Sequence, residues 1–255
     1  MSKILILDIE TSPNVAYVWR FFKENIAPSQ VIKNSNILSF AAKWLHSEEI
    51  LYRDTHIWSE QYLLEDLNKL LDEADIVVTH YGNKFDLPRI RARSLVFGIS
   101  PPSPYKTVDT CMVAKRLFSF ESNSLEYLVK QLGIGEKLTH KKFPGFALWI
   151  EVLRNNPEAW DEMKRYNIHD TVLTERLYLK LRPWINNHPN VAINEEDEGL
   201  VCPKCGGKHL GRRGFYTTNA GKYQRYRCDD CGGWSRTRFT ELDKEKRRNL
   251  LTNAT

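Results

Sequence analysis

The residues of this 255-residue chain best suited to chemistry are Asp8 and Glu10, which end an apolar run near the start. The run over residues 3–11 is typical of a buried strand in a mixed or parallel sheet. Because side chains alternate along a strand, both carboxylates project from one face, about 7 Å apart at roughly 3.3 Å per residue. Two acids that repel each other and lose hydration favour a divalent cation between them. A solvated strand end is the alternative, unless the chain supplies more carboxylates.

A second acid, Asp86, follows a turn after another apolar run. Residues 75–80 predict a buried strand, Gly82 and Asn83 indicate a turn, and Pro88 two residues after Asp86 is typical of a first helical turn. Asp86 could serve only as the N-cap of this helix. Its position at the carboxyl end of a strand, where ligands bind in α/β sheets, makes it a candidate metal ligand as well.

A third acid, Asp170, lies within the long amphipathic helix predicted over residues 157–181. Tyr166 precedes it by one turn on the same face, so both side chains can address one point. A buried Asp needs a partner, and a salt bridge to an arginine is the alternative to a cation. The other members of the stripe that contains both residues are apolar: Trp160, Met163, Leu173, Leu177 and Leu181.

The elements that must position these acids form an α/β pattern. After the first strand, residues 15–22, 37–45 and 50–56 predict strands of an antiparallel meander. Residues 61–74 predict a helix, and β-α alternation follows from residue 75. Residues 107–110 predict the start of a helix with Asp109 as its N-cap, and Ser124 opens another helix that Gly133 ends. Cys111 is expected to be a small core residue.

Taken together, these motifs resemble the DEDD superfamily of 3′-to-5′ exonucleases, in its tyrosine-bearing branch. The proofreading exonuclease domain of family B DNA polymerases is the nearest likeness, and it covers about residues 3–182. The stretches that carry it are Asp8-x-Glu10 in residues 8–11, residues 83–86, residues 107–110, residues 124–128 before Gly133, and Tyr166-x-x-x-Asp170. A histidine branch would place its base at position 165, where this chain has an arginine.

The resemblance implies a ribonuclease H-like fold, with a central mixed sheet flanked by helices. It also implies hydrolysis of phosphodiesters by two magnesium or manganese ions, which suit all-oxygen ligation. Asp8 would bridge the ions, and Glu10, Asp86 and Asp170 would complete the ligand set. Tyr166 would orient or help deprotonate the attacking water. Asn83 and Thr11 are expected to contact the nucleic acid.

The C-terminal part of the chain predicts a separate metal module. Residues 183–200 lose helical periodicity and end in an acidic run, which indicates a linker. Residues 201–240 hold two Cys-x-x-Cys pairs, each followed by glycine: Cys202, Cys205, Cys228 and Cys231. This spacing predicts a zinc ribbon with one structural zinc ion, against the alternatives of an iron site or a redox dithiol. A basic tail follows over residues 241–255.

Basic and aromatic residues alternate between the two cysteine pairs. Residues 210–218 and 222–227 predict a hairpin around Gly221. Because cations attract phosphates and aromatic faces stack on bases, nucleic-acid binding is expected, while a solvated basic surface is the alternative. The residues expected to bind are Arg212, Arg213, Tyr223, Arg225, Arg227 and Trp234. A short segment around Cys228 is similar to zinc ribbons of transposase-associated DNA-binding proteins.

Charge is distributed unevenly along the chain. Residues 201–255 hold thirteen lysines and arginines against five acids, a net charge of +8, whereas residues 1–200 carry −3. No apolar run is long enough to span a bilayer, and the first one ends in acids, so we expect neither a membrane segment nor a signal peptide and place the protein in the cytoplasm.

The sequence therefore predicts an exonuclease acting on 3′ ends, single-stranded DNA before RNA, with the ribbon assisting nucleic-acid binding. One alternative is a non-catalytic nucleic-acid-binding protein on a degenerate nuclease fold. Another is a proofreading subunit whose ribbon docks a polymerase or another replication or repair protein. The sequence leaves the oligomeric state open.

Overall fold

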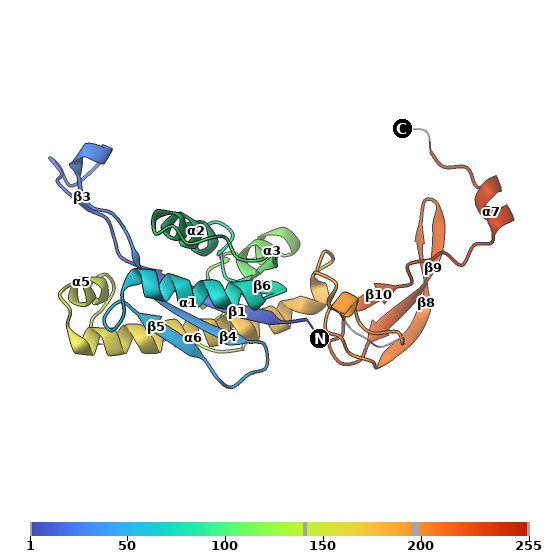
Figure 1. The fold of residues 1–255 in the computed structure, drawn as a ribbon. Coiled ribbons are helices and arrows are strands. Elements are labelled where there is room, and N and C mark those ends of the chain that lie inside the picture. Colours follow the sequence, from blue (N-terminus) through green and yellow to red (C-terminus); the bar gives the residue numbers. More distant parts are fainter. Residues whose placement is uncertain (1, 140–141, 195–198, 254–255) are drawn as a thin grey trace. The chain divides into compact units, whose positions relative to one another are not determined.

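A computed structural model describes residues 2–139, 142–194 and 199–253. The chain forms two compact units. The larger one, called the body here, spans Lys3–Tyr178 and carries the predicted acids. The smaller one contains Leu179–Thr255 together with Ser2 and carries the four paired cysteines. Figure 1 shows the course of the chain through both units.

The body is built on a five-stranded mixed sheet. Its strands, in the order β5-β4-β1-β6-β7, are Leu51–Asp54, Ile37–Trp44, Ile4–Thr11, Ile76–Thr79 and Lys106–Asp109. The central strand β1 pairs antiparallel with β4 and parallel with β6, and β6 pairs parallel with β7. The carboxyl ends of β1, β6 and β7 therefore lie at the same edge of the sheet.

Helices cover both faces of this sheet (Figure 1). Their bounds are α1 Glu60–Glu73, α2 Asp86–Val96, α3 Thr110–Leu117, α4 Leu125–Gln131, α5 Ala147–Leu153 and α6 Pro157–Leu181. Ser59 caps α1 through Tyr62 N–H, and Ser124 caps α4 through Tyr127 N–H. The predicted helix over residues 157–181 is confirmed over its whole length, as is the end of α4 at Gly133, which has a positive φ of 62°.

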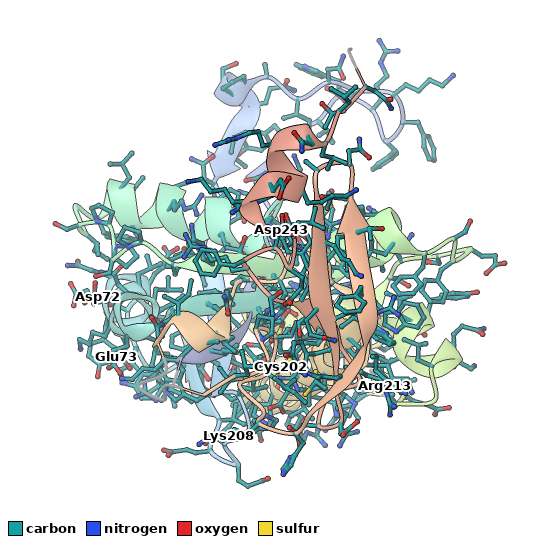
Figure 2. All side chains as sticks on the ribbon, turned by 90° about the vertical axis from the view of Figure 1, so that its right-hand side faces the viewer. Asp72, Glu73, Cys202, Lys208, Arg213 and Asp243 are labelled. Carbon is teal, nitrogen blue, oxygen red and sulfur yellow. The ribbon has the colours of Figure 1, made fainter. Side chains whose placement is uncertain are left out.

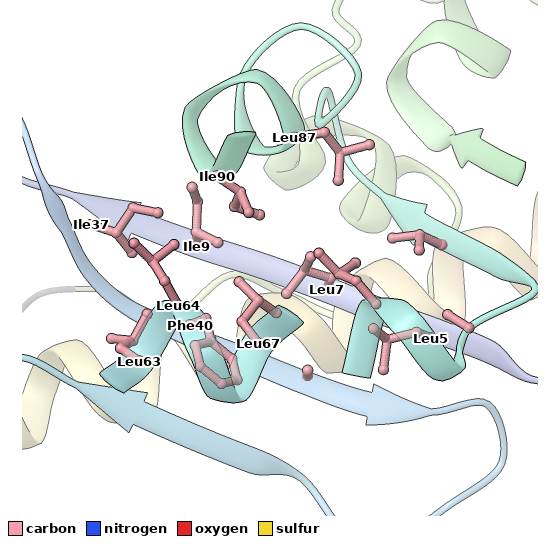
Figure 3. Close-up of a cluster of buried hydrophobic side chains, with 14 residues drawn as sticks. Leu5, Leu7, Ile9, Ile37, Phe40, Leu63, Leu64, Leu67, Leu87 and Ile90 are labelled. Carbon is pink, nitrogen blue, oxygen red and sulfur yellow. The ribbon is translucent and has the colours of Figure 1, made fainter. Parts of the chain in front are cut away.

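The main apolar core lies between the sheet and the helices α1 and α2. Leu5, Leu7 and Ile9 of β1 meet Phe40 of β4 and Leu67 of α1 there (Figure 3). A second cluster, which joins Leu38 of β4 to α5 and α6, covers the other face. Because side chains alternate along β1, Asp8 and Glu10 project away from the main core, toward the face that α6 covers.

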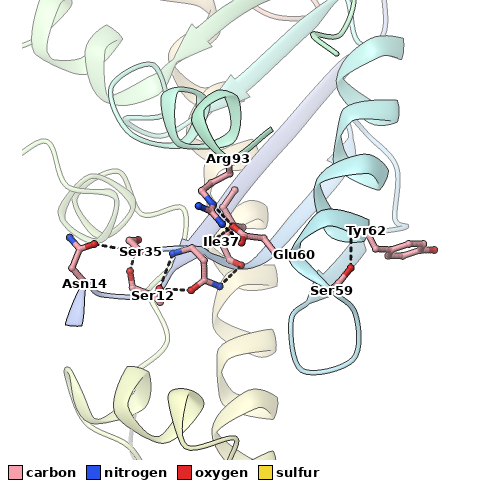
Figure 4. A network of polar contacts seen from close by, with 9 residues as sticks. Ser12, Asn14, Ser35, Ile37, Ser59, Glu60, Tyr62 and Arg93 are labelled. Carbon is pink, nitrogen blue, oxygen red and sulfur yellow. Dashed lines mark hydrogen bonds and ion pairs between the residues drawn. The ribbon is translucent and has the colours of Figure 1, made fainter. Parts of the chain in front are cut away.

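A polar network fixes the chain where it leaves the sheet (Figure 4). Glu60 accepts two hydrogen bonds from the Arg93 guanidinium, at 2.8 and 2.6 Å, and a third from Ile37 N–H. Ser12 Oγ lies 2.7 Å from Asn36 Oδ1, and Ser35 Oγ donates to the Ser12 carbonyl. These bonds tie the starts of α1 and β4 to α2 and hold the residues that follow Glu10.

Residues 15–22 were predicted as a strand, and most of that prediction is wrong. Only Val15–Ala16 (β2) is a strand, paired with β3 at Val31–Lys33. Residues 17–30 form an irregular loop with one 3₁₀ turn at Pro28–Gln30, and we call this loop the arm. Its aromatic side chains are exposed, and those of Trp19 and Phe21 are more than 90% exposed. The Glu24 carboxylate, which accepts from Trp19 N–H and Arg20 N–H, orders the loop in place of a strand partner.

Residues 107–110, predicted to begin a helix, belong mostly to strand β7, which ends at Asp109. The helix α3 starts only at Thr110, although Asp109 does cap it by accepting from Met112 N–H. The prediction failed because β7 contains a single apolar residue, Val108, and so lacks the apolar run that marked β6, a strand of the same length.

The smaller unit contains a three-stranded antiparallel sheet in the order β10-β9-β8. Its strands are β8 Leu210–Thr218, β9 Gly221–Cys228 and β10 Trp234–Arg236, and two 3₁₀ turns precede them at Arg182–Trp184 and Val191–Asn194. The predicted hairpin around Gly221 is confirmed. Cys202 lies toward one end of this hairpin and Asp243, which caps the short helix α7 (Lys244–Asn249), toward the other (Figure 2).

Across the described part of the chain, none of the helices combines the length and the apolar character needed to cross a bilayer.

The core predicts a stability test. Leu67 is fully buried in α1, so Leu67→Ala removes apolar contacts and leaves a cavity. We expect the free energy of unfolding of the body to fall by about 2–5 kcal/mol, measured by urea titration. Leu95→Ala in α2 is the matched control, because Leu95 is 80% exposed and its truncation should change that free energy by less than about 0.5 kcal/mol. Equal losses in the two variants would contradict this assignment of the core.

Candidate active site

A cavity of about 510 Å³ lies in the body at the carboxyl ends of β1 and β6. All five predicted catalytic side chains line it: Asp8, Glu10, Asp86, Tyr166 and Asp170. They come from the end of β1, the start of α2 and the middle of α6, which are far apart in the sequence. The fold thus brings together the acids that the sequence had indicated.

Asp8 is oriented by a residue of α6. The amide Nδ2 of Asn167 donates to Asp8 Oδ2 at 2.6 Å and to the Asp8 carbonyl at 3.3 Å. Asn167 is fully buried, and its Oδ1 in turn accepts from Ser39 Oγ of β4 at 2.9 Å. This chain of hydrogen bonds leaves Asp8 Oδ1 available to a ligand in the cavity.

Asp86 does not act as the N-cap that the sequence suggested as an alternative. The N-cap position is Phe85, and Asp86 is the first residue of α2. The Asp86 carboxylate instead accepts from Ile9 N–H of β1 at 3.2 Å, and its side chain is buried. This bond ties α2 to the strand that carries Asp8 and Glu10, and it aims Asp86 at the same cavity.

Asp170 has a cationic partner, but the partner is a lysine of a loop rather than an arginine. Lys137 Nζ lies 2.8 Å from Asp170 Oδ2 and donates to Tyr166 Oη at 2.5 Å. The same ammonium lies 4.6 Å from the centroid of the Tyr166 ring, and Trp149 packs edge-on against that ring. The other Asp170 oxygen, Oδ1, is buried without a hydrogen-bond partner.

The pKa values of these four acids are raised, because the acids are buried and lie near one another. Burial, followed by repulsion from Glu10, Asp86 and Asp170, raises the pKa of Asp8 well above its usual range. Burial and Asp170 raise the pKa of Glu10 to about 8. Burial raises the pKa of Asp86 to about 7, although the Ile9 N–H bond opposes it. Burial also raises the pKa of Asp170, against the pull of Lys137.

The turn that leads into α2 is held by Asp109. Its carboxylate accepts from Tyr81 N–H at 2.9 Å and from Asn83 N–H at 3.1 Å. Gly82 lies so close to Thr79 that a Cβ there would approach the threonine hydroxyl to 2.3 Å. A larger residue at position 82 would therefore displace the turn and, with it, Asp86.

Burial lowers the pKa of His80 to about 4, so this histidine is neutral at physiological pH. Its ring nitrogens bond Thr110 Oγ1 at 2.9 Å and the Asn123 carbonyl at 3.1 Å. These bonds fix the His80 ring in the wall of the cavity and tie it to Thr110 and to the segment that contains Asn123.

The donor set fits hard divalent cations. It consists of carboxylate oxygens, which magnesium and manganese prefer, and the orphaned Asp170 Oδ1 would gain a ligand. Among the described residues, only the four cysteines bring three or more ligand atoms within 4.8 Å of one another, so no three of these acids lie as close together as the cysteines do. Lys137 supplies the positive charge that the structure shows beside Asp170.

Two residues of the site, Asn167 and Lys137, were not indicated by the sequence. Asn167 is a polar residue three positions before Asp170, a signal that could have marked it as inward-facing. Lys137 lies in the loop between α4 and α5, where no periodicity points to it. Of the predicted nucleic-acid contacts in the body, Thr11 and Asn83 are absent from the described lining of the cavity.

The four cysteines of the smaller unit form a second candidate metal site. Cys202 Sγ lies 3.7 Å from Cys231 Sγ, and Cys205 Sγ lies 3.7 Å from Cys228 Sγ. A tetrahedral ion with metal–sulfur bonds of about 2.3 Å places its sulfurs about 3.8 Å apart, so the spacing fits zinc.

The two cysteine pairs are built alike. Gly206 N–H donates to the Cys202 carbonyl and Gly232 N–H to the Cys228 carbonyl, each at 2.9 Å. Both glycines have a φ of 74°, a conformation that side chains disfavour. The glycine after each second cysteine therefore closes the turn that aims two thiols at one point.

Comparison with known proteins agrees with this architecture. Residues 5–182 match the family model of the RNase H superfamily. The structure of the family B DNA polymerase from the hyperthermophilic archaeon Pyrobaculum calidifontis is similar over 72% of this chain, with a TM-score of 0.53 and 17% sequence identity. The similar part is 25% of that polymerase chain, and at this identity the likeness shows the fold alone. Among curated proteins, no match was found.

The raised pKa values predict how stability depends on pH. Glu10 and Asp86 bind protons more tightly in the folded protein than in the unfolded chain, so their contribution is fully present below about pH 4 and is lost as the pH rises through about 7 and 8. Without added magnesium, we expect a lower melting temperature at about pH 8.5 than at about pH 6, and a smaller difference in Glu10→Gln. Thermal unfolding measures both.

Glu158→Gln is the matched control for this test, because Glu158 is an exposed acid on α6, outside the cavity. It should retain the pH dependence of the wild type. If Glu10→Gln retained it too, the repulsion assigned to Glu10 would be wrong.

Proposed function

The chain belongs to the RNase H superfamily, and from this premise we propose that it is a metal-dependent 3′-to-5′ exonuclease. A nuclease fold of this kind supports hydrolysis of nucleic acid, and the proposal adds the direction of attack and the use of two metal ions. DNA is proposed before RNA because the similar solved structure is a DNA polymerase.

One observation carries the proposal: four acids with raised pKa values, from three distant segments, line a single cavity. Burying like charges together costs free energy, which the fold must supply from its apolar core. A protein that needed no cations here would be more stable with neutral residues at these positions. The arrangement is therefore best explained if the negative charge of the four acids binds cations.

Asp8, Glu10, Asp86 and Asp170 are the residues that would hold the ions. When bound, two divalent ions would lower the pKa of a water molecule and stabilise the departing 3′ oxygen. Asp8 would hold the ions through Oδ1, because Asn167 already donates to its other oxygen, Oδ2. The Ile9 N–H bond to Asp86 Oδ1 fixes the opposite side of the set.

Tyr166 is suited to orient the attacking water. Burial and the nearby Asp170 raise the pKa of Tyr166, so its hydroxyl keeps its proton at neutral pH. It therefore acts by hydrogen bonding rather than as a base. Lys137 positions it, since the Lys137 ammonium donates to Tyr166 Oη and pairs with Asp170. Burial opposes the charge on Lys137, but Asp170 and Tyr166 outweigh burial and raise its pKa.

Digestion of end-labelled single- and double-stranded DNA and RNA with magnesium tests the proposal. We expect shortening from the 3′ end by the wild type and a rate at least about 100-fold lower for Asp8→Ala, because its ligand position is central to the set. Removing divalent ions should abolish trimming in both.

Asp161→Ala is the matched control, because it removes one carboxylate of α6 that does not line the cavity. It should trim at the wild-type rate. Equal rates for Asp8→Ala and the wild type would contradict the proposed active site. Cleavage at internal positions would contradict the proposed 3′-to-5′ direction.

We also propose that the four cysteines hold one structural zinc ion. So small a sheet has little apolar core, and zinc binding is worth about 10–16 kcal/mol in comparable peptides, so the ion would fold it. Elemental analysis should find about one zinc per chain in the wild type and none in Cys228→Ser. Cys111→Ser, at the buried cysteine of the body, is the control and should retain the zinc. Iron in place of zinc would contradict this proposal.

A further inference from the structure

The smaller unit contains a groove whose chemistry the proposed catalysis does not use. Its volume is about 690 Å³, and none of the residues that line it in the described chain is acidic. The lining combines cationic and aromatic side chains, chiefly Lys204, Tyr216, Arg225, Trp234, Arg236 and Arg238. Such a lining matches a ligand that is both anionic and aromatic.

The register of the sheet explains why these side chains share one face. Tyr216 pairs with Tyr223 across β8 and β9, and Arg225 pairs with Arg236 across β9 and β10. Alternation along β9 then places Tyr223 and Arg225 on the groove face, while Gln224 and Tyr226 are buried on the other. Arg212, which pairs with Tyr226, belongs to that other face.

The arginines of this face are held by the aromatic rings. The Arg236 guanidinium lies 3.9 Å from the ring centroid of Tyr223, and that of Arg225 lies 4.9 Å from the ring centroid of Trp234. Arg225 Nε donates to the Arg213 carbonyl, so its two Nη groups remain for a ligand. A guanidinium held in this way loses little conformational freedom on pairing with a phosphate.

The aromatic side chains are held in place yet accessible. Trp234 is 48% exposed and Tyr216 is 47% exposed, although each packs beside an arginine. An exposed ring beside a fixed cation can stack on a base while the cation binds the adjoining phosphate. Bases offer their faces in this way only when they are unpaired.

We propose that this groove binds single-stranded nucleic acid, with bases stacked on Trp234 and Tyr216 and phosphates bound by Arg225, Arg236 and Arg238. The inference rests on the proposed function for its choice of ligand, since an acidic peptide would satisfy the arginines but not the exposed rings. It narrows the binding surface of the ribbon to one face of its sheet and excludes Arg212 from that surface.

Fluorescence anisotropy of the full chain with a labelled oligothymidylate tests the proposal. The measurements are made in an Asp8→Ala background, so that the strand is not trimmed. We expect Trp234→Ala to weaken binding roughly tenfold and Trp234→Phe to restore most of it, because stacking needs a ring. We expect Arg236→Ala to lower the slope of log K against log salt by about 0.7, the share of one phosphate contact on a single strand.

Two controls accompany these variants. Arg248→Ala removes a charge from α7, outside the groove, and should change neither the affinity nor the salt slope by as much as Arg236→Ala. The zinc content of each variant shows whether the ribbon has stayed folded, and only variants with wild-type zinc are compared. A duplex of the same sequence should bind more weakly than the single strand.

Binding by the groove and catalysis in the body can be tested separately. Catalysis is measured as magnesium-dependent hydrolysis of a small ester, thymidine 5′-(p-nitrophenyl phosphate), by the wild type. If the wild type hydrolyses the ester but Trp234→Ala binds the oligonucleotide as tightly as before, the proposed binding groove is contradicted and the proposed enzymatic activity is not. If Trp234→Ala binds the oligonucleotide more weakly and the wild type does not hydrolyse the ester, the binding groove is supported and the proposed enzymatic activity is contradicted. Equal affinity for strand and duplex would also overturn the groove proposal.

Discussion

Repulsion among four desolvated carboxylates is the constraint around which the body is arranged. Asp8 and Glu10 are carried on a strand whose opposite face packs into the main apolar core, so the strand cannot rotate them into water. Asp86 is tied to that strand by the Ile9 N–H, and Asp170 is carried on a helix of 25 residues. The apolar packing thus stores an electrostatic strain that only positive charge relieves. Lys137 relieves part of it, at Asp170.

Sequence patterns predicted the elements that have a long, uniform environment. The strand β1 is buried on both faces over most of its length and appears as one apolar run, whereas the long helix α6 carries an apolar stripe, so the acids in both elements stand out. Contacts that depend on chain segments meeting in space could not be predicted. The Ile9 bond to Asp86 spans 77 positions, and Lys137 reaches Asp170 from a loop without periodicity.

Strand propensity failed at residues 15–22 for a related reason. Valine, tyrosine, tryptophan and phenylalanine favour strands because they pack against neighbouring strands, and beyond Ala16 no described strand pairs with this segment. In the ribbon, by contrast, the same residue types have partners on both sides of β9, and the predicted hairpin forms. The proposed zinc would then stabilise the ribbon without the apolar core that the body requires.

The arm has a consequence for handling the protein. Trp19, Phe21 and Phe22 hold a large apolar area in water on a loop that Glu24 keeps in shape, so this area does not collapse onto itself. Any apolar material that touches the tip gains the free energy of releasing that water, at about 25 cal/mol per Å². In concentrated preparations such tips would associate with one another, and they would adsorb to apolar surfaces such as plastic.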